Sequence, residues 1–74
     1  MADGFIHTVY KGDQWINEVE GGEAFGGGYA NKDEAVAAGR GRAKQGKTEH
    51  VIHNQDGKIS ERSSYGNDPV GRPG

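Results

Sequence analysis

Cysteine is absent from this chain, so neither a disulfide nor a thiolate metal site can stabilise it. Apolar residues are scarce as well, at 31% of the 74 residues. A chain of this length buries only ~60% of the surface that its unfolded form exposes, which leaves little free energy to hold the fold. Chains this small often rely on a partner subunit. We therefore expect a single domain whose core is completed by a partner, in the simplest case as a homodimer.

The chain also has no long apolar run and no basic cluster at its start, where Met1–Gly4 carries no positive side chain. A secretory signal needs both features, and a membrane span needs ~20 consecutive apolar residues. The missing cysteines fit a reducing compartment. We therefore expect a soluble cytoplasmic protein without a membrane segment.

Positive charge is scarce in the first half of the chain. Residues 1–34 hold seven acidic side chains against two lysines, whereas residues 35–74 hold seven basic side chains against four acidic ones. Such asymmetry is found in proteins that bind a polyanion with one face. It is equally explained by attraction between the two halves, which fits the overall net charge of −2 better.

Two strands are expected at the start of the chain. Residues 5–10 are rich in β-branched and aromatic side chains, Lys11-Gly12-Asp13 reads as a turn, and residues 15–19 alternate again. Alternation places Trp15, Asn17 and Val19 on one face of the second strand. Trp15 is the only tryptophan, and we expect it to anchor the buried side of the sheet.

Residues 24–29 predict a weaker third strand, with Phe25 and Tyr29 in phase. Gly26-Gly27-Gly28 lies within it, and glycines inside a strand suggest a bulge or a close backbone approach. A phosphate-binding loop is excluded because the segment has neither a lysine at Walker spacing nor a dinucleotide-binding glycine pattern.

A single helix is expected from about Lys32 to Gln45. Asn31 is a suitable N-cap residue, Glu34 stands where a capping box requires it, and Gly46 is expected to supply the left-handed stop. The inward stripe consists of small residues apart from one valine: Ala35, Val36, Gly39 and Ala43. A face this shallow must lie close against the sheet.

A second hairpin follows the helix, with strands at 49–54 and 59–65 joined by Gln55-Asp56-Gly57-Lys58. Residues 67–74 contain two prolines and two glycines and read as a flexible tail beyond a single domain of residues 1–66. The resulting order, βββαββ, predicts the α+β class: a small antiparallel sheet with one helix packed on one face.

Three segments of the sequence belong together: His7-Thr8-Val9 followed by Trp15, the helix start Lys32–Ala38, and the second hairpin with its exit, His53–Ile59 and Ser64–Pro69. In these three places the sequence resembles the DUF2188 family of small uncharacterised bacterial proteins. The resemblance spans about Phe5 to Pro69, although the family usually has polar residues in place of Gly26–Gly28. It implies the fold order and a bacterial cytoplasmic setting, and it brings no activity and no catalytic residue.

Three histidines are the only side chains that invite a metal or acid–base proposal. His50 and His53 are three residues apart on a strand and therefore point to opposite faces, which prevents them from chelating one ion. His7 could pair with one of them across strands, but two histidines without a placed carboxylate make a weak zinc site. We interpret all three as ordinary strand residues near the sheet surface, and expect no metal, no cofactor and no catalytic residue.

Two functions follow from these patterns. The first is a non-catalytic accessory protein that binds another protein or itself, because the core is small and no sheet edge is obviously blocked. Its candidate interface aromatics are Tyr10, Phe25, Tyr29 and Tyr65, each of which could instead complete the core.

The alternative is nucleic-acid binding. Four basic residues crowd the second half of the helix and its exit, and Gly71-Arg72-Pro73 resembles the core of a minor-groove hook. The candidate contacts are Arg40, Arg42, Lys44, Lys47 and Arg72. The helix dipole also explains positive charge at this end of a helix.

Overall fold

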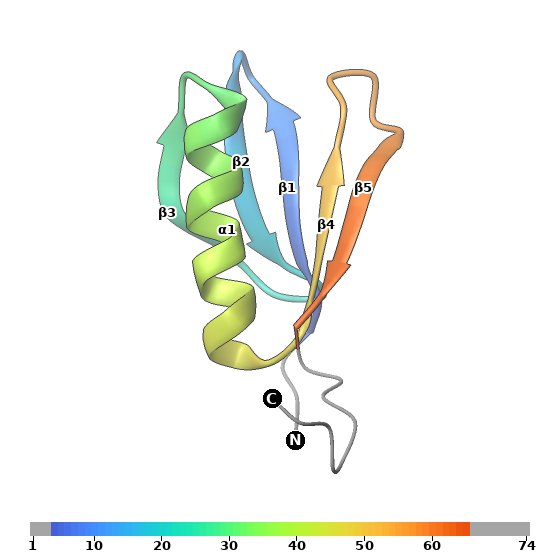
Figure 1. Cartoon of the computed structure of the whole chain (residues 1–74). Helices are drawn as coiled ribbons and strands as arrows, with labels where there is room; N and C mark the ends of the chain where they lie inside the picture. The colour runs from blue at the N-terminus through green and yellow to red at the C-terminus, as the bar shows by residue number, and fades with distance from the viewer. Residues whose placement is uncertain (1–3, 66–74) are drawn as a thin grey trace, which may run out of the picture.

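The structure, a computed structural model, describes residues 4–65 as five strands and one helix in the expected order (Figure 1). The predicted tail at 67–74 lies outside the described residues. The elements are β1 (Ile6–Lys11), β2 (Gln14–Val19), β3 (Ala24–Tyr29), α1 (Lys32–Gly46), β4 (Glu49–His53) and β5 (Ile59–Ser64). The α+β class and the helix packed on the sheet are confirmed.

The five strands form one sheet in the order β3-β2-β1-β4-β5. Three neighbouring pairs are antiparallel, but β1 and β4 are parallel, with Ile6 opposite His50 and Thr8 opposite Ile52. The prediction of a wholly antiparallel sheet is therefore wrong at this central pair. The cause is the long connection from β1 to β4, which includes α1 and returns the chain to the end of the sheet where β1 begins.

Both predicted hairpin turns are present. Gly12 and Asp13 have φ values of 56° and 67°, which is the two-residue turn that suits the twist of paired strands. In the second hairpin, the amide of Asn54 donates to the carbonyl of Lys58 at 2.8 Å. The first turn places Trp15 beside Tyr10, and their ring centroids are 5.0 Å apart.

The glycine segment is a strand with a bulge. Asn17 pairs with Phe25, whereas its neighbour Ile16 pairs with Gly28, so Gly26 and Gly27 lie outside the ladder. Both have positive φ, 76° and 73°, a conformation that costs glycine little and other residues more. The bulge makes the β3 edge of the sheet irregular.

The helix ends one residue later than predicted. Lys47, rather than Gly46, has the left-handed conformation, with φ 53° and ψ 55°. The amide of Thr48 donates to the carbonyl of Ala43 at 3.0 Å and the amide of Lys47 to that of Lys44 at 3.3 Å, which closes the helix in a Schellman motif. At the other end Asn31 is the N-cap, but its side chain makes no capping hydrogen bond.

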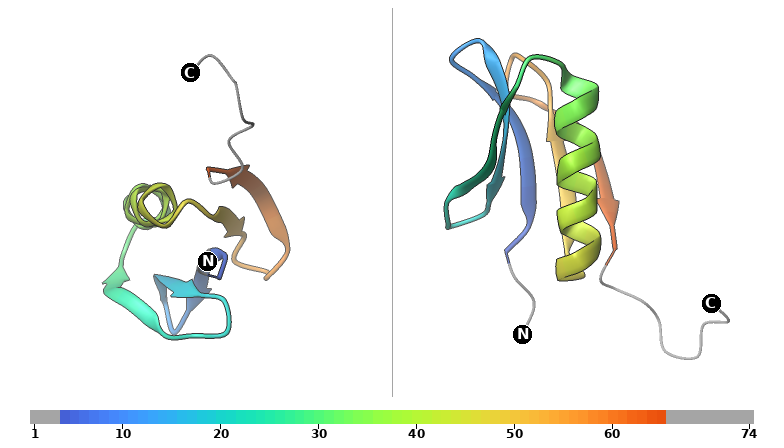
Figure 2. Two further views of the ribbon diagram at one scale, coloured as in Figure 1. Left: turned by 90° about the horizontal axis from the view of Figure 1, so that it is seen from below. Right: turned by 90° about the vertical axis from the view of Figure 1, so that its left-hand side faces the viewer.

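The helix lies on one side of the sheet, and the opposite side, which we call the open face, carries no helix (Figure 2). Ala35, Gly39 and Ala43 are buried against the strands as predicted, whereas Val36 is only half-buried. Trp15 is buried, as predicted. In the described part of the chain, no helix has the length and apolar character needed to cross a membrane.

Candidate functional site

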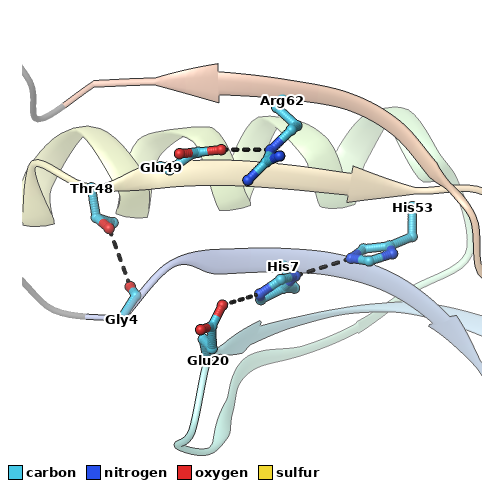
Figure 3. Close-up of polar contacts among 7 residues, drawn as sticks. All are labelled: Gly4, His7, Glu20, Thr48, Glu49, His53 and Arg62. Carbon is cyan, nitrogen blue, oxygen red and sulfur yellow. Dashed lines mark hydrogen bonds and ion pairs between the residues drawn. The ribbon is translucent and has the colours of Figure 1, made fainter.

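His7 and His53 meet on the open face. His7 projects from β1 and His53 from the end of β4, and His7 Nδ1 lies 3.0 Å from His53 Nε2 (Figure 3). The ring centroids are 5.2 Å apart, close to the hydrogen-bond length plus one ring radius at each end. The two nitrogens therefore point at one another. The cross-strand pairing of His7 that the sequence allowed is thus formed, with His53 as its partner.

Each ring has a second partner. His7 Nε2 lies 2.8 Å from Oε1 of Glu20, just beyond β2 (Figure 3). His53 Nδ1 lies 3.2 Å from the carbonyl oxygen of Gly57 in the β4–β5 turn. The result is a continuous chain of hydrogen bonds, Glu20–His7–His53–Gly57, which we call the histidine relay. Within residues 4–65, no group of three or more His, Cys, Asp or Glu side chains is arranged to hold a metal ion.

The third histidine has a different environment. His50 is only 1% exposed and lies on the helix side of the sheet, so its interpretation as a residue near the sheet surface is wrong. His50 and His53 do point to opposite faces of β4, as their spacing predicted, but α1 covers the face to which His50 points. Burial lowers the pKa of His50, and the positive charge of Arg40 lowers it further. The ring is therefore neutral at physiological pH.

His50 belongs to a buried polar triad with Thr8 and Asn17. The Thr8 hydroxyl donates to Oδ1 of Asn17 at 2.6 Å and lies 2.7 Å from Nε2 of His50. The Thr8 hydroxyl has a single proton, which it donates to Asn17. In its bond with His50 the hydroxyl oxygen must therefore accept, so Nε2 of His50 carries the proton and donates it. The amide of Asn17 donates to the carbonyl of Ala35 in α1 at 2.9 Å, which ties the triad to the helix.

Gly39 of α1 sits directly on this triad. A Cβ atom at position 39 would lie 2.6 Å from Oδ1 of Asn17, 2.7 Å from Nε2 of His50 and 2.9 Å from the Thr8 hydroxyl. The triad was missed in the sequence, although two signals were present. Alternation put Asn17 on the same face as Trp15, and Gly39 stood in the inward stripe of the helix.

The predicted basic patch is divided in the structure. The guanidinium of Arg42 lies over the ring of Phe25 in β3, 5.0 Å from its centroid, whereas Nζ of Lys44 lies over Tyr65, 5.7 Å from its centroid. Helical periodicity places Arg40 and Lys44 together on one flank and Arg42 on the other. Lys47 is exposed at the helix end. Arg72 lies outside the described residues.

The four candidate aromatics are each half-buried. Tyr10 contacts Trp15, Tyr29 is paired with Trp15 across strands, and Phe25 and Tyr65 lie under Arg42 and Lys44. They surround the core rather than form a common exposed patch. The exposed large apolar residues of the described chain are Phe5 and Ile59, at 37% and 53%.

Elsewhere on the open face, charged side chains at the surface cover an apolar residue close to the sheet. Lys11 forms an ion pair with Glu18, and Nε of Arg62 lies 2.7 Å from Oε2 of Glu49 (Figure 3). Val51 of β4 lies between its neighbours His7 of β1 and Arg62 of β5, and it is only 2% exposed although no helix covers it. Polar side chains therefore shield the apolar centre of this face.

The chain matches, over residues 6–65, the family described as an uncharacterised protein conserved in bacteria, DUF2188. The match covers most of the 74 residues, and the chain belongs to this family. No curated protein and no solved structure shows significant similarity to the chain. The resemblance seen in the sequence is thereby confirmed.

Proposed function

We propose that this chain is a non-catalytic bacterial accessory protein, acting in the cytoplasm, that binds an extended segment of another protein along β5. The observation that carries the proposal is the position of β5, which ends the sheet and is the one strand that α1 does not contact. An edge strand presents free backbone groups to which a further strand can be added. Ile59, at its start, is the more exposed of the two exposed large apolar residues of residues 4–65.

The opposite edge is less suitable. The bulge at Gly26 and Gly27 interrupts the ladder of β3, and bulges are one way in which proteins protect edges from pairing. Arg42 also covers Phe25 on this side of the molecule. This contrast favours β5 as the binding edge.

A second copy of the chain fits β5 poorly in the two registers that pair most of the strand. If two copies pair their β5 strands antiparallel in one continuous sheet, a two-fold axis perpendicular to that sheet relates the copies. Residues that lie opposite one another then have their side chains on the same face of the sheet. An axis at position 61 places Glu61 opposite Glu61, and an axis at position 62 places Arg62 opposite Arg62. Like charges opposite one another destabilise a strand pair. The partner that fits is a different chain, with a basic side chain opposite Glu61 and an acidic one opposite Arg62.

The non-catalytic part of the proposal is supported by the triad. Thr8 and His50 lie at the distance expected of a nucleophile and its base, but they are only 0% and 1% exposed. No substrate can reach them in this fold. The arrangement serves to join α1 to the sheet.

A displayed library of random eight-residue peptides tests the proposal. Selected peptides should slow amide hydrogen exchange in β5 and should carry a basic residue at one fixed position. Glu61→Lys should weaken their binding about two- to tenfold, and an acidic residue at that peptide position should restore it. Glu23→Lys, an exposed reversal beside β3, is the control and should leave binding unchanged. Protection confined to α1 or β3 would refute the assignment.

Light scattering addresses the homodimer expected from the small core. Replacing both Glu61 and Arg62 by serine removes the like charges from the β5 edge, so self-association should increase in that variant relative to the natural chain. A natural chain that already dimerises through β5, shown by exchange protection of β5 that vanishes on dilution, would favour self-association over a different partner.

Nucleic-acid binding is the alternative function. Arg40 and Lys44 share one flank of α1, and Lys44 lies beside the half-buried ring of Tyr65, a combination of charge and aromatic surface that suits a single strand. Support for nucleic-acid binding is weaker than for peptide binding, because Arg42 lies on the other flank of α1 and the predicted basic patch is divided. Titration with labelled single-stranded and duplex DNA at 20 and 200 mM salt decides: a phosphate site should give steeply salt-dependent binding. No binding at low salt removes this function.

A further inference from the structure

The histidine relay ends on an acceptor at both sides. The carbonyl oxygen of Gly57 can only accept, so its bond requires a proton on His53 Nδ1. The carboxylate of Glu20 also accepts, so its bond requires a proton on His7 Nε2. The bond between the rings needs one more proton, on His7 Nδ1 or His53 Nε2. Three protons are therefore needed, and two neutral imidazoles carry only two.

We propose that His7 and His53 form a proton-binding site that takes up one proton beyond the neutral pair and holds it against Glu20. The positive charge is shared along the bond between the two rings and is balanced by the carboxylate. Of the protein side chains, imidazole is the one whose charge ordinarily changes between about pH 5 and 8.

Two ion pairs lie near the relay on the open face: Lys11 of β1 is paired with Glu18 of β2, and Arg62 of β5 with Glu49 of β4. The β4–β5 turn contributes Asp56, which accepts from the backbone amide of Lys58, and the Lys58 side chain. On the helix side, burial and Arg40 of α1 lower the pKa of His50 and Glu61 of β5 raises it; the net shift is downward, so no second imidazolium forms across the sheet. Glu20 is thus the acidic group that directly contacts the relay.

Loss of the extra proton removes one of the three bonds. The least costly change is at Glu20, whose side chain is 59% exposed and can turn into water, whereas that of His7 is only 22% exposed. The relay joins β1, the end of β2 and the β4–β5 turn, which are distant in sequence. Its proton therefore controls whether Glu20, at the end of β2, stays bonded to His7 of β1.

The proton site does not rest on the function proposed above, because it can be measured in the free protein. A failed peptide selection would leave the proton measurement unaffected.

Nitrogen NMR of the imidazole rings tests the site on chelator-treated full-length protein. The natural chain should show a coupling across the hydrogen bond between His7 Nδ1 and His53 Nε2, and three protons on the two rings. In Glu20→Gln the amide can donate to a neutral His7, so the relay is complete with two protons. The third proton should be lost about half a pH unit lower in this variant, a threefold drop in proton affinity.

Glu23→Gln is the matched control, because it removes one exposed carboxylate from the same loop without touching the relay. It should titrate as the natural chain does. The proposal is overturned if Glu20→Gln and Glu23→Gln lose the third proton at the same pH, or if no coupling joins the rings. It is also overturned if one equivalent of Zn²⁺ displaces the shared proton and shifts both rings, which would assign the position to a metal ion.

Discussion

Gly39 of the helix faces Asn17 of β2 so closely that a methyl group on residue 39 would lie 2.6 Å from the amide oxygen of Asn17. The close contact exists because the helix rests on three hydrogen-bonded polar side chains rather than on apolar ones. An unpaired buried polar group is costly, so the three side chains form their mutual bonds in only one arrangement, in which Nδ1 of His50 is the buried polar side-chain atom of residues 4–65 left without a partner. The triad thus fixes where α1 sits on the sheet.

Gly39→Ala should destabilise the protein by about 1–3 kcal/mol, because the added methyl group pushes into the triad. Gly41→Ala is the control from the same helix, where a Cβ atom meets nothing within 4 Å. This second change should stabilise the fold by up to about 1 kcal/mol through helix propensity. Urea unfolding followed by Trp15 fluorescence gives both values. Equal effects of the two substitutions would show that the helix does not approach the sheet as described.

Thr8→Val should cost about 1–3 kcal/mol, because it keeps the side-chain shape but leaves Asn17 and His50 without their shared partner. Thr8→Ser keeps the hydroxyl and loses one methyl group, so its cost should stay near 1 kcal/mol. The two variants are compared by urea unfolding at pH 7.5. If valine proves the milder substitution, the hydroxyl does not hold the triad together.

His50 makes stability depend on pH. Its pKa is lowered by burial in the fold, so below about pH 6.5 the unfolded chain takes up a proton that the folded chain refuses. His50 therefore does not change the free energy of unfolding above about pH 6.5, and it lowers the free energy of unfolding as the pH falls below that value. The chain carries two further histidines, His7 and His53, so the natural chain alone is not a clean test.

The difference between the natural chain and His50→Gln isolates the buried imidazole. The difference in unfolding free energy should favour the natural chain more at pH 7.5 than at pH 5. Urea unfolding at the two pH values measures it. An identical difference at both would mean that His50 is as free to accept a proton in the fold as in the unfolded chain.

Lys47→Gly should stabilise the protein by up to about 1 kcal/mol, because lysine pays a steric penalty in the left-handed conformation and glycine does not. Lys47→Ala removes the amine but keeps the penalty, and should not stabilise. Thermal unfolding by circular dichroism compares the three chains. Stabilisation by alanine equal to that by glycine would point to the charge rather than the backbone.

Local patterns alone determined the elements of this protein. Alternation predicted the strands, the small-residue stripe predicted the buried face of the helix, and adjacent glycine and aspartate residues predicted the hairpin turns, because each pattern depends on neighbours in the chain. The left-handed stop was misplaced by one residue, since the Schellman bonds from Lys47 and Thr48 reflect how the chain turns into β4 rather than which residue prefers positive φ.

Only the tertiary structure decided which strands are neighbours and which face is covered. The parallel pairing of β1 with β4 brings His7 within 3.0 Å of His53, although 46 positions separate them in the sequence. The same pairing buries His50, because the face to which it points lies under α1. Residue spacing showed that His50 and His53 face opposite ways, but the partner of each follows from packing between distant segments, which spacing does not encode.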